Sequence, residues 1–287
     1  DRAFPLKCLD DEVRVNSYID QYFHRNWSSG KIKDVFITVG GGGATGVEMA
    51  GELAGSLKIL CRKYRFPRNK IHIQIVDGAP TLAGLDKSGS DLIVKRLKHL
   101  GVEIYLKRFI QKVSKDRVFL KSKDGSIEDI ASDITIWTGG VKVHPVVASS
   151  LGSAERRGAI VVNKFLQMEG HPEIFAAGDN TFCLDLNNQP FPMLAQVAYK
   201  EGALIAANIS ALLQGEKLSE FKLGHTHYLL PIGGKYAFWR FGHHTFVGFW
   251  PWLVRRMVFF HYMISILPFW KAVGKWWHSQ MVFVDND

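Results

Sequence analysis

The chain has 287 residues, which suits about two domains, and its 47% apolar and 22% charged residues are typical of a folded globular protein. This composition excludes a disordered or collagen-like chain, and three widely spaced cysteines with no CxxC exclude a disulfide scaffold and a dithiol redox centre within it. The formal charge of +9 indicates an acidic partner, such as nucleic acid, an anionic membrane or a polyanionic substrate.

The first 30 residues predict a connecting segment with one helix over residues 11–24, which the Ser28-Ser29-Gly30 sequence ends. The chain has neither an initiator methionine nor the pattern of a secretory signal, so we expect that it begins partway into a longer protein. The longest charge-free apolar stretch near the other end, residues 257–270, is shorter than the roughly 20 residues that span a bilayer. No membrane-spanning helix is therefore predicted.

A strand, a glycine-rich loop, a helix and a second strand come next and predict a βαβ unit. The apolar run over residues 35–39 is short enough for a buried strand and leads directly into the glycines of residues 40–46. Apolar residues then recur every three or four positions over residues 47–64, which is the period of a helix. The alternating isoleucines of residues 71–75 predict the second strand, which ends at Asp77.

The rest of the chain predicts the end of this first domain and part of a second one. We expect a helix over residues 90–100, a strand over 102–105, a small antiparallel hairpin between 110 and 130, strands over 134–137, 159–162 and 174–179, and a helix over 194–213. No glycine fingerprint occurs after residue 145, so we expect the second domain to be incomplete by itself.

The loop residues Gly41, Gly43 and Gly46 fit the GxGxxG spacing of dinucleotide-binding proteins. In that motif the first glycine allows a tight turn, the second leaves room for a pyrophosphate, and the third lets helix and strand pack closely. Asp77, at the end of the next strand, is placed to accept hydrogen bonds from an adenosine ribose, and its charge favours NAD(H) over NADP(H). The alternative is a glycine turn that binds no ligand.

Glu48 follows the glycine loop, on what we expect to be the first turn of the helix. Its carboxylate could stabilise the helix N-terminus through the helix dipole, an effect of about 0.3 to 1 kcal/mol. It could instead face a bound nicotinamide. The residues themselves leave both interpretations open.

Residues 39–53, with the sequence VGGGGATGVEMAGEL, resemble the NADH-binding motif of type II NADH dehydrogenases, the single-subunit flavoprotein NADH:quinone oxidoreductases. Three later segments are similar to the same family. Residues 136–142 resemble its strand and glycine turn beside the nicotinamide, residues 174–179 resemble its second flavin motif, and residues 195–198 resemble the segment packed on the isoalloxazine near the quinone.

The resemblance implies two cofactors, NADH and FAD, and a membrane quinone as the electron acceptor. It implies a proton relay at Glu48, a quinone contact at Gln196, and a proton donor or electrostatic partner at Lys200. The residues that it implies for cofactor binding are Gly41, Gly43, Ala44, Thr45, Gly46, Asp77, Gly139, Gly140, Gly178, Asp179, Ala195 and Gln196.

Two features depart from the family pattern. Family members begin with a first Rossmann half that carries the FAD glycine fingerprint, and this chain starts after it, so we expect the chain to hold FAD poorly by itself. The family commonly has Gln at the position of Lys200, which changes the expected quinone pocket.

The C-terminal segment is rich in aromatic and basic residues. Residues 238–284 contain 15 aromatic residues, five Lys or Arg and no Asp or Glu. On a helical wheel an apolar face and a basic stripe lie side by side. The apolar face comprises Trp270, Val273, Trp277 and Met281, and the basic stripe comprises Lys271, Lys275 and His278. This pattern is typical of helices at the surface of an anionic membrane, and a buried aromatic core is the alternative. Nucleic acid is not expected, because the segment is too apolar for a solvated groove.

Two histidine pairs could suggest a metal site. They are His225 with His227, and His243 with His244. Neither pair has a third ligand at a useful spacing, so we interpret both as structural and predict no metal. Cys61, in the long helix, is interpreted as a core residue.

The predicted fold class is α/β, with a Rossmann-type NAD-binding domain, the second part of an FAD-binding domain and C-terminal amphipathic helices. The expected boundaries are 1–30 for the connecting segment, 31–144 for the NADH-binding domain, 145–224 for the part of the FAD-binding domain and 225–287 for the membrane-interface region. The expected function is hydride transfer from NADH to FAD and electron transfer to a quinone without proton pumping, at the cytoplasmic face of a membrane. The alternatives are a soluble flavoprotein reductase of a protein carrier and a non-catalytic NAD(H)-binding module, and the resemblance also allows a homodimer.

Overall fold

The structure is a computed structural model that describes residues 3–28, 32–140, 143, 146–147, 158–184, 190–224 and 226–285, with only the backbone of 280–285. The chain forms two compact units, Asp1–Gly139 together with Tyr228–Asp287, and Gly140–His227. The C-terminal segment therefore belongs to the same unit as the βαβ segment, although residues 140–227, which lie between the two parts of this unit in sequence, form the other unit.

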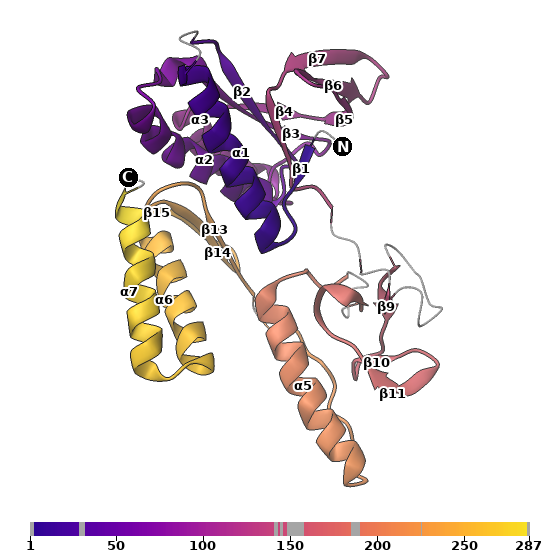
Figure 1. The fold of residues 1–287 in the computed structure, drawn as a ribbon. Helices are drawn as coiled ribbons and strands as arrows, with labels where there is room; N and C mark the ends of the chain where they lie inside the picture. The colour runs from indigo at the N-terminus through magenta and orange to yellow at the C-terminus, as the bar shows by residue number, and fades with distance from the viewer. Residues whose placement is uncertain are drawn as a thin grey trace. The chain divides into compact units, whose positions relative to one another are not determined.

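A parallel sheet forms the centre of the first unit (Figure 1). Its strand order is β1-β8-β2-β3-β4. Its strands are β1 (Ala3–Pro5), β8 (Ile134–Trp137), β2 (Val35–Gly40), β3 (Ile71–Asp77) and β4 (Val102–Leu106). The helices of this part are α1 (Leu9–Ser28), α2 (Ala44–Lys63) and α3 (Lys87–His99), and a 3-10 turn, η1 (Arg68–Lys70), precedes β3. Because all four pairings are parallel, the carboxyl ends of these strands lie at one edge, where ligands of such sheets bind.

Burial explains the apolar patterns of these elements. Val35, Ile37 and Val39 on one face of β2 and Thr38 on the other face are each 0% exposed, as expected for a strand covered on both sides. In α2 the buried residues recur at helical spacing, so one face of the helix packs on the sheet. Fully burying an aliphatic side chain of this size stabilises a fold by about 1.5 to 3 kcal/mol. The predicted strand-loop-helix-strand order is thus the order of the structure.

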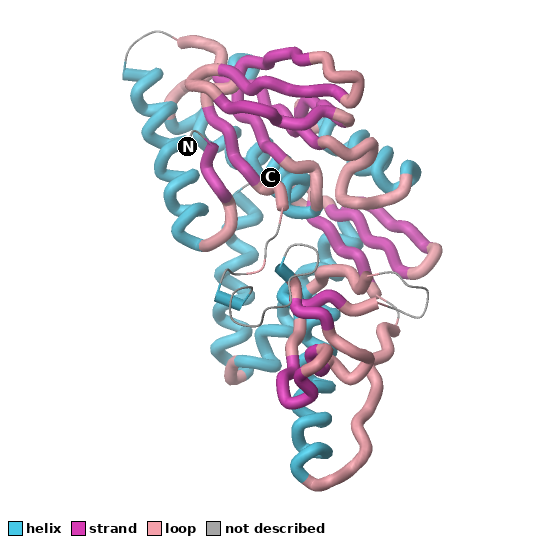
Figure 2. The backbone as a smooth tube through the Cα atoms, turned by 90° about the vertical axis from the view of Figure 1, so that its right-hand side faces the viewer, coloured by secondary structure: helices cyan, strands magenta, loops and turns pink. Residues whose placement is uncertain are grey.

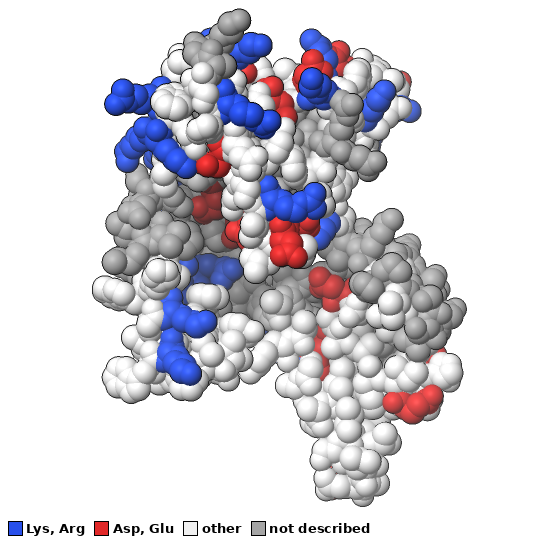
Figure 3. Space-filling view, viewed as in Figure 1, with Lys and Arg blue, Asp and Glu red and all other residues white. Residues whose placement is uncertain are grey.

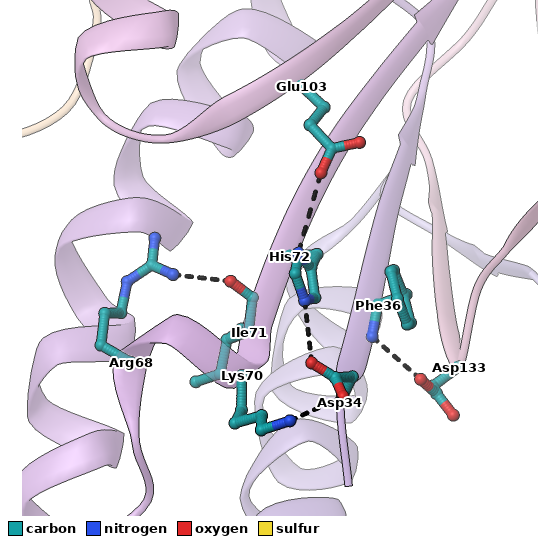
Figure 4. A network of polar contacts seen from close by, with 8 residues as sticks. All are labelled: Asp34, Phe36, Arg68, Lys70, Ile71, His72, Glu103 and Asp133. Carbon is teal, nitrogen blue, oxygen red and sulfur yellow. Dashed lines mark hydrogen bonds and ion pairs between the residues drawn. The ribbon is translucent and has the colours of Figure 1, made fainter.

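A polar network ties the amino ends of β2, β3 and β4 together (Figure 4). Asp34 accepts from Lys70 Nζ at 3.0 Å and pairs with His72 Nε2 at 3.1 Å, and the opposite ring nitrogen of His72 lies 3.7 Å from Glu103. The hydrogen bond from His72, followed by that from Lys70, lowers the pKa of Asp34. This network lies at the edge of the sheet away from the glycine loop, so its role is structural. Asp133 supports it by accepting the backbone N–H of Phe36 at 2.9 Å.

Residues 108–131 form a three-stranded antiparallel sheet, so the predicted two-stranded hairpin was incomplete. The strands are β5 (Arg108–Val113), β6 (Arg117–Ser122) and β7 (Ile127–Ala131). The expected turn at residues 123–125 joins β6 to β7, whereas β5 pairs with the other edge of β6 through an irregular register. A second turn, at residues 114–116, carried no glycine signal, which is why the third strand was missed.

The second unit is built around α5 (Ala195–Leu213) and two small strand pairs (Figure 2). The pairs are β9 (Ile160–Val161) with β12 (Thr181–Phe182), and β10 (Gln167–Met168) with β11 (His171–Phe175). A 3-10 turn, η3 (Gly178–Asn180), connects the β11 region to β12. The segment predicted as one strand over residues 174–179 is therefore the end of a strand followed by a turn.

The C-terminal segment adds a three-stranded sheet and a helical hairpin to the first unit. The strands are β13 (His227–Pro231), β14 (Ala237–Phe241) and β15 (His244–Gly248), and the helices are α6 (Phe249–Ile266) and α7 (Phe269–Asp285). Trp276 of α7 donates its indole N–H to the carbonyl of Arg256 at 3.1 Å and packs on Phe260 of α6. No helix in the described part of the chain combines the length and the hydropathy needed to cross a bilayer.

Candidate functional site

The glycine loop lies at the carboxyl end of β2, and its backbone is packed tightly against its surroundings. Gly41 has a φ of +111°, a conformation that L-residues with a side chain rarely adopt, and its N–H donates to Val76 at 2.9 Å. A Cβ on Gly46 would lie 1.8 Å from the carbonyl oxygen of Gly41. Thr138, directly after β8, closes the loop from the other side, because its hydroxyl lies 3.1 Å from the carbonyl oxygens of both Gly40 and Gly41 and donates to them. The first and third motif glycines are therefore required by packing alone.

The second motif glycine, Gly43, faces open space. It is the N-cap of α2, it is exposed, and a Cβ placed on it would meet no atom within 4 Å. No side chain caps the backbone N–H groups of this helix end, and the next residues, Ala44 and Thr45, are exposed as well. A helix end with open N–H groups and a partial positive charge is a site for a phosphate.

Asp77 ends β3 beside this loop. Its carboxylate accepts the backbone N–H of Gly42 and, at 2.6 Å, the backbone N–H of Ala79. A carboxylate has about four acceptor positions, so these two bonds leave room for ribose hydroxyls. The side chain thus holds the loop, and its binding of a ribose stays a prediction. Gly42, whose Cβ would lie 2.9 Å from that of Asp77, was missed because it falls between the motif glycines.

Glu48 is the fifth residue of α2 and lies on its second turn, so its predicted place on the first turn was wrong. The helix begins at Ala44, before the position expected from the apolar pattern, and its first turn has no acidic residue. The carboxyl lines a cavity of about 810 Å³ between the start of α1 and α2, together with Glu52 and Lys7. Burial raises the pKa of Glu48, and Arg255 of α6 opposes this shift.

The segment that follows β8 begins beside the glycine loop, where Thr138 and Gly139 lie against Gly41. Gly139 accepts a hydrogen bond from Lys7 Nζ at 3.2 Å, and Gly140 is exposed with a φ of +74°. Lys142, which the resemblance includes, lies outside the described residues. The return strand thus brings Thr138 and Gly139 to the edge where β2 and β3 end.

The second unit contains the turn that resembles a flavin motif. Gly178 has a φ of +70° and donates its N–H to the buried carboxyl of Glu201 at 2.6 Å. Asp179 is exposed on this turn. A cavity of about 50 Å³ lies beneath it and is lined by Gly178, Cys183, Val197 and Glu201, among others. Glu201 was missed by the sequence analysis, and its signal is a single acid among the small and apolar residues of α5.

The other predicted residues of this unit lie at the start of α5. Ala195 is its first residue and is exposed, and Lys200 is exposed one turn further along. Gln196 uses its amide within the unit, because it donates to the carbonyl of His227 and accepts the N–H of the same residue at 3.3 Å. Glu48 belongs to the first unit, and Gln196 and Lys200 belong to the second.

The described residues contain no cluster of three or more His, Cys, Asp or Glu that could hold a metal ion. His225 lies outside the described residues, and His243 and His244 are exposed around the β14–β15 turn. Cys61 is partly buried against the main core, and burial raises the pKa of its thiol.

Comparisons with known proteins fit this geometry. A Type II NADH:quinone oxidoreductase of Staphylococcus epidermidis is 31% identical over 229 residues, which are 77% of this chain and 56% of the relative. The protein of the same name from Staphylococcus aureus has the same identity and coverage, so the resemblance stated from the motifs is confirmed. The chain spans about half the length of the curated relatives it matches.

Solved structures confirm the α/β fold class. NDH2 from Plasmodium falciparum in complex with NADH superposes with a TM-score of 0.81 at 17% identity, over 100% of this chain and 73% of that chain. The sulfide:quinone oxidoreductase from Aquifex aeolicus does so with a TM-score of 0.75 at 15% identity, over 95% and 64%. Residues 10–202 match the family model described as pyridine nucleotide-disulphide oxidoreductase. The chain therefore belongs to the pyridine nucleotide-disulphide oxidoreductase family.

Proposed function

We propose that the chain is the NADH-binding part, and a portion of the FAD-binding part, of a type II NADH:quinone oxidoreductase. The observation that carries this proposal is the open end of α2 at Gly43, at the carboxyl edge of the sheet and next to the carboxylate of Asp77. The name shared by the curated relatives supports the same conclusion.

NADH would be held by backbone more than by side chains. The N–H groups of Ala44, Thr45 and Gly46 would bind the pyrophosphate, and Asp77 would accept the ribose hydroxyls. Gly139 and Gly140 lack side chains and would leave room for the nicotinamide. A carboxylate at Asp77 repels a 2′-phosphate, so NADH is preferred over NADPH.

FAD would be held in the second unit by the turn at Gly178 and Asp179 and by the start of α5 at Ala195 and Gln196. This turn fits a bound dinucleotide, because its backbone is fixed and Asp179 is exposed. When bound, FAD accepts a hydride from NADH and passes electrons to the quinone. The protein contributes alignment of these partners, which can account for a large share of the rate without a nucleophile.

Quinone reduction also consumes protons, and two side chains are suited to supply them. Glu48 holds a proton at a higher pH than an ordinary glutamate, because burial raises its pKa. It opens on a cavity that contains a second carboxyl, Glu52, one helical turn away. Lys200 is an exposed cation, which suits it to attract the reduced quinone or to donate a proton to it. No step in this scheme moves protons across a membrane.

The C-terminal helices would bind the cytoplasmic surface of an anionic membrane. Trp250, Trp270 and Trp277 are 73%, 80% and 64% exposed, which is unusual for tryptophan in a water-facing surface. Figure 3 shows the hairpin of α6 and α7 at the lower left as a mainly uncharged surface with basic side chains. Tryptophan and lysine together suit the headgroup region of a bilayer. The homodimer stays a prediction from the resemblance.

An anaerobic visible spectrum of the chain with added FAD, before and after NADH, tests the catalytic proposal. With the first half of a relative supplied, we expect bound flavin whose absorbance bleaches with NADH and much less with NADPH, which serves as the matched control. Bound NADH with no bleaching, including when the first half of a relative is supplied, would favour the non-catalytic NAD(H)-binding module.

Vesicle binding tests the membrane proposal separately. The chain should sediment with phosphatidylglycerol vesicles, and a Trp270→Ala, Trp277→Ala double variant should lose most of this binding. The matched control is Trp27→Ala, which removes a tryptophan that is 54% exposed on α1. Equal loss in both variants would refute the role of the two α7 tryptophans, and no sedimentation of the wild type at low salt would favour a soluble reductase.

A further inference from the structure

A buried carboxyl lies directly under the turn that resembles a flavin motif. Glu201 of α5 is only 2% exposed. Most of the other residues of this helix are small or apolar, so a buried carboxyl is unexpected there. Its side chain accepts the backbone N–H of Gly178 at 2.6 Å. An ionisable group is costly to bury unless it has a hydrogen-bond partner. The bond to Gly178 therefore accounts for the buried position of the Glu201 carboxyl.

The hydrogen bond to Glu201 fixes the backbone N–H of Gly178, and Thr181 fixes its backbone carbonyl. The carbonyl of Gly178 accepts the hydroxyl of Thr181 at 2.8 Å and also the backbone N–H of that residue. A Cβ on Gly178 would lie 3.3 Å from the Cβ of Ala198, one helical turn before Glu201. Helix α5 therefore supports this glycine through both a hydrogen bond and a close approach. The supported turn leaves Asp179 exposed.

We propose that Glu201 is a positioning residue, whose carboxyl holds the Gly178–Asp179 turn in the conformation that receives FAD. The inference rests on the proposed function only for the identity of the ligand. Glu201 acts through the turn and does not touch the ligand itself.

The charge of Glu201 gives this support a dependence on pH. Burial raises the pKa of Glu201, the hydrogen bond from Gly178 opposes this shift, and the nearby charge of Asp179 adds to it. The net direction is upward, so Glu201 keeps a proton at a higher pH than an ordinary glutamate. The thiol of Cys183 also faces it, and burial together with Glu201 raises the pKa of that thiol. An approaching diphosphate favours the protonated, neutral form of Glu201. The affinity for FAD should therefore fall as the pH rises through this pKa.

The first test measures the turn without any flavin. In the full chain labelled with ¹⁵N, the amide of Gly178 should resonate downfield and shift with pH, with a midpoint above the ordinary glutamate value of 4.5. Glu201→Gln keeps a carbonyl acceptor and cannot titrate, so the Gly178 amide should stay downfield and lose its midpoint. A wild-type amide that does not titrate, or a midpoint that persists in Glu201→Gln, would overturn the proposal.

The second test measures FAD binding by quenching of flavin fluorescence. Glu201→Ala should weaken binding about tenfold, whereas Glu201→Gln should stay within about threefold of the wild type and show a flat pH profile. Asn208→Ala is the matched control, because Asn208 is also buried on α5 and hydrogen-bonds the backbone of Ser219, away from the turn. This control should leave the affinity unchanged.

The outcomes separate the two proposals. Wild-type binding with no loss in Glu201→Ala, or with the same loss in Asn208→Ala, would refute the positioning role while FAD binding stands. A wild type that binds no FAD, with or without the first half of a relative, would refute the proposed function. The titration of the Gly178 amide would still decide whether Glu201 holds the turn.

Discussion

Replacement of Gly46 by alanine should lower the free energy of unfolding, because the site has no room for a methyl group. A Cβ on Gly46 would lie 1.8 Å from the carbonyl oxygen of Gly41, which is at least 1.2 Å closer than the 3.0 Å that real Cβ atoms keep. That oxygen belongs to the backbone, and Thr138 Oγ1 would lie only 2.9 Å away, so α2 must move off the loop. Overpacking of this kind costs about 1 to 3 kcal/mol, and the backbone contact places this variant near 3 kcal/mol.

Gly43→Ala is the matched control, because the same methyl group there meets no atom within 4 Å. Gly43 has a φ of −67°, which alanine adopts without strain. The weaker N-cap of alanine and its smaller unfolded-state entropy roughly cancel, so the free energy of unfolding should change by less than about 0.5 kcal/mol. The methyl group would, however, occupy the space where the pyrophosphate of NADH is proposed to approach. The Kd for NADH should therefore rise about tenfold or more.

Urea denaturation followed by circular dichroism gives the free energy of unfolding, and calorimetric titration gives the Kd for NADH. A Gly46→Ala variant as stable as the wild type would refute the packing of α2 on the loop. Unchanged NADH affinity in Gly43→Ala would refute the proposed position of the pyrophosphate. The two variants thus separate the stability of the loop from its affinity for the ligand.

Three further outcomes are expected. Asn208→Ala should lower the free energy of unfolding, measured in urea, by about 2 to 3 kcal/mol, because the buried amide of Asn208 forms hydrogen bonds with both the N–H and the carbonyl of Ser219. A change below about 0.5 kcal/mol would contradict this. Tyr22→Phe should cost about 1 to 2 kcal/mol by the same measurement, since it removes a 2.7 Å hydrogen bond to Asp133; an equally stable variant would show that the bond contributes nothing. Burial raises the pKa of Glu201 in the folded state, so its contribution to stability should be present below the ordinary value of 4.5 and be lost as the pH rises through the folded pKa. Glu201→Gln should remove that part of the pH dependence of unfolding, and identical curves would contradict it.

The amino-acid sequence alone determined the parts of this protein whose signals are local. Three signals depend only on neighbouring residues: the apolar run of β2, the glycine spacing from Gly41 to Gly46 and the helical period of α2. The strand, the loop and the helix that they predicted are present in the structure. The same holds for α5 and for Asp77 at the end of β3. Local steric and periodic constraints are written into contiguous residues, so a single sequence displays them.

Only the tertiary structure decided which distant residues meet. β1 lies next to β8 although about 130 residues separate them, and Glu201 reaches Gly178 across 23 residues. No periodicity records such contacts, because they depend on how whole elements pack. The place of Glu48 on the second turn of α2, its cavity and the bond from Gly42 to Asp77 were decided in the same way. Burial and hydrogen bonding at these positions are properties of the folded chain, since each requires atoms that folding brings from elsewhere in the sequence.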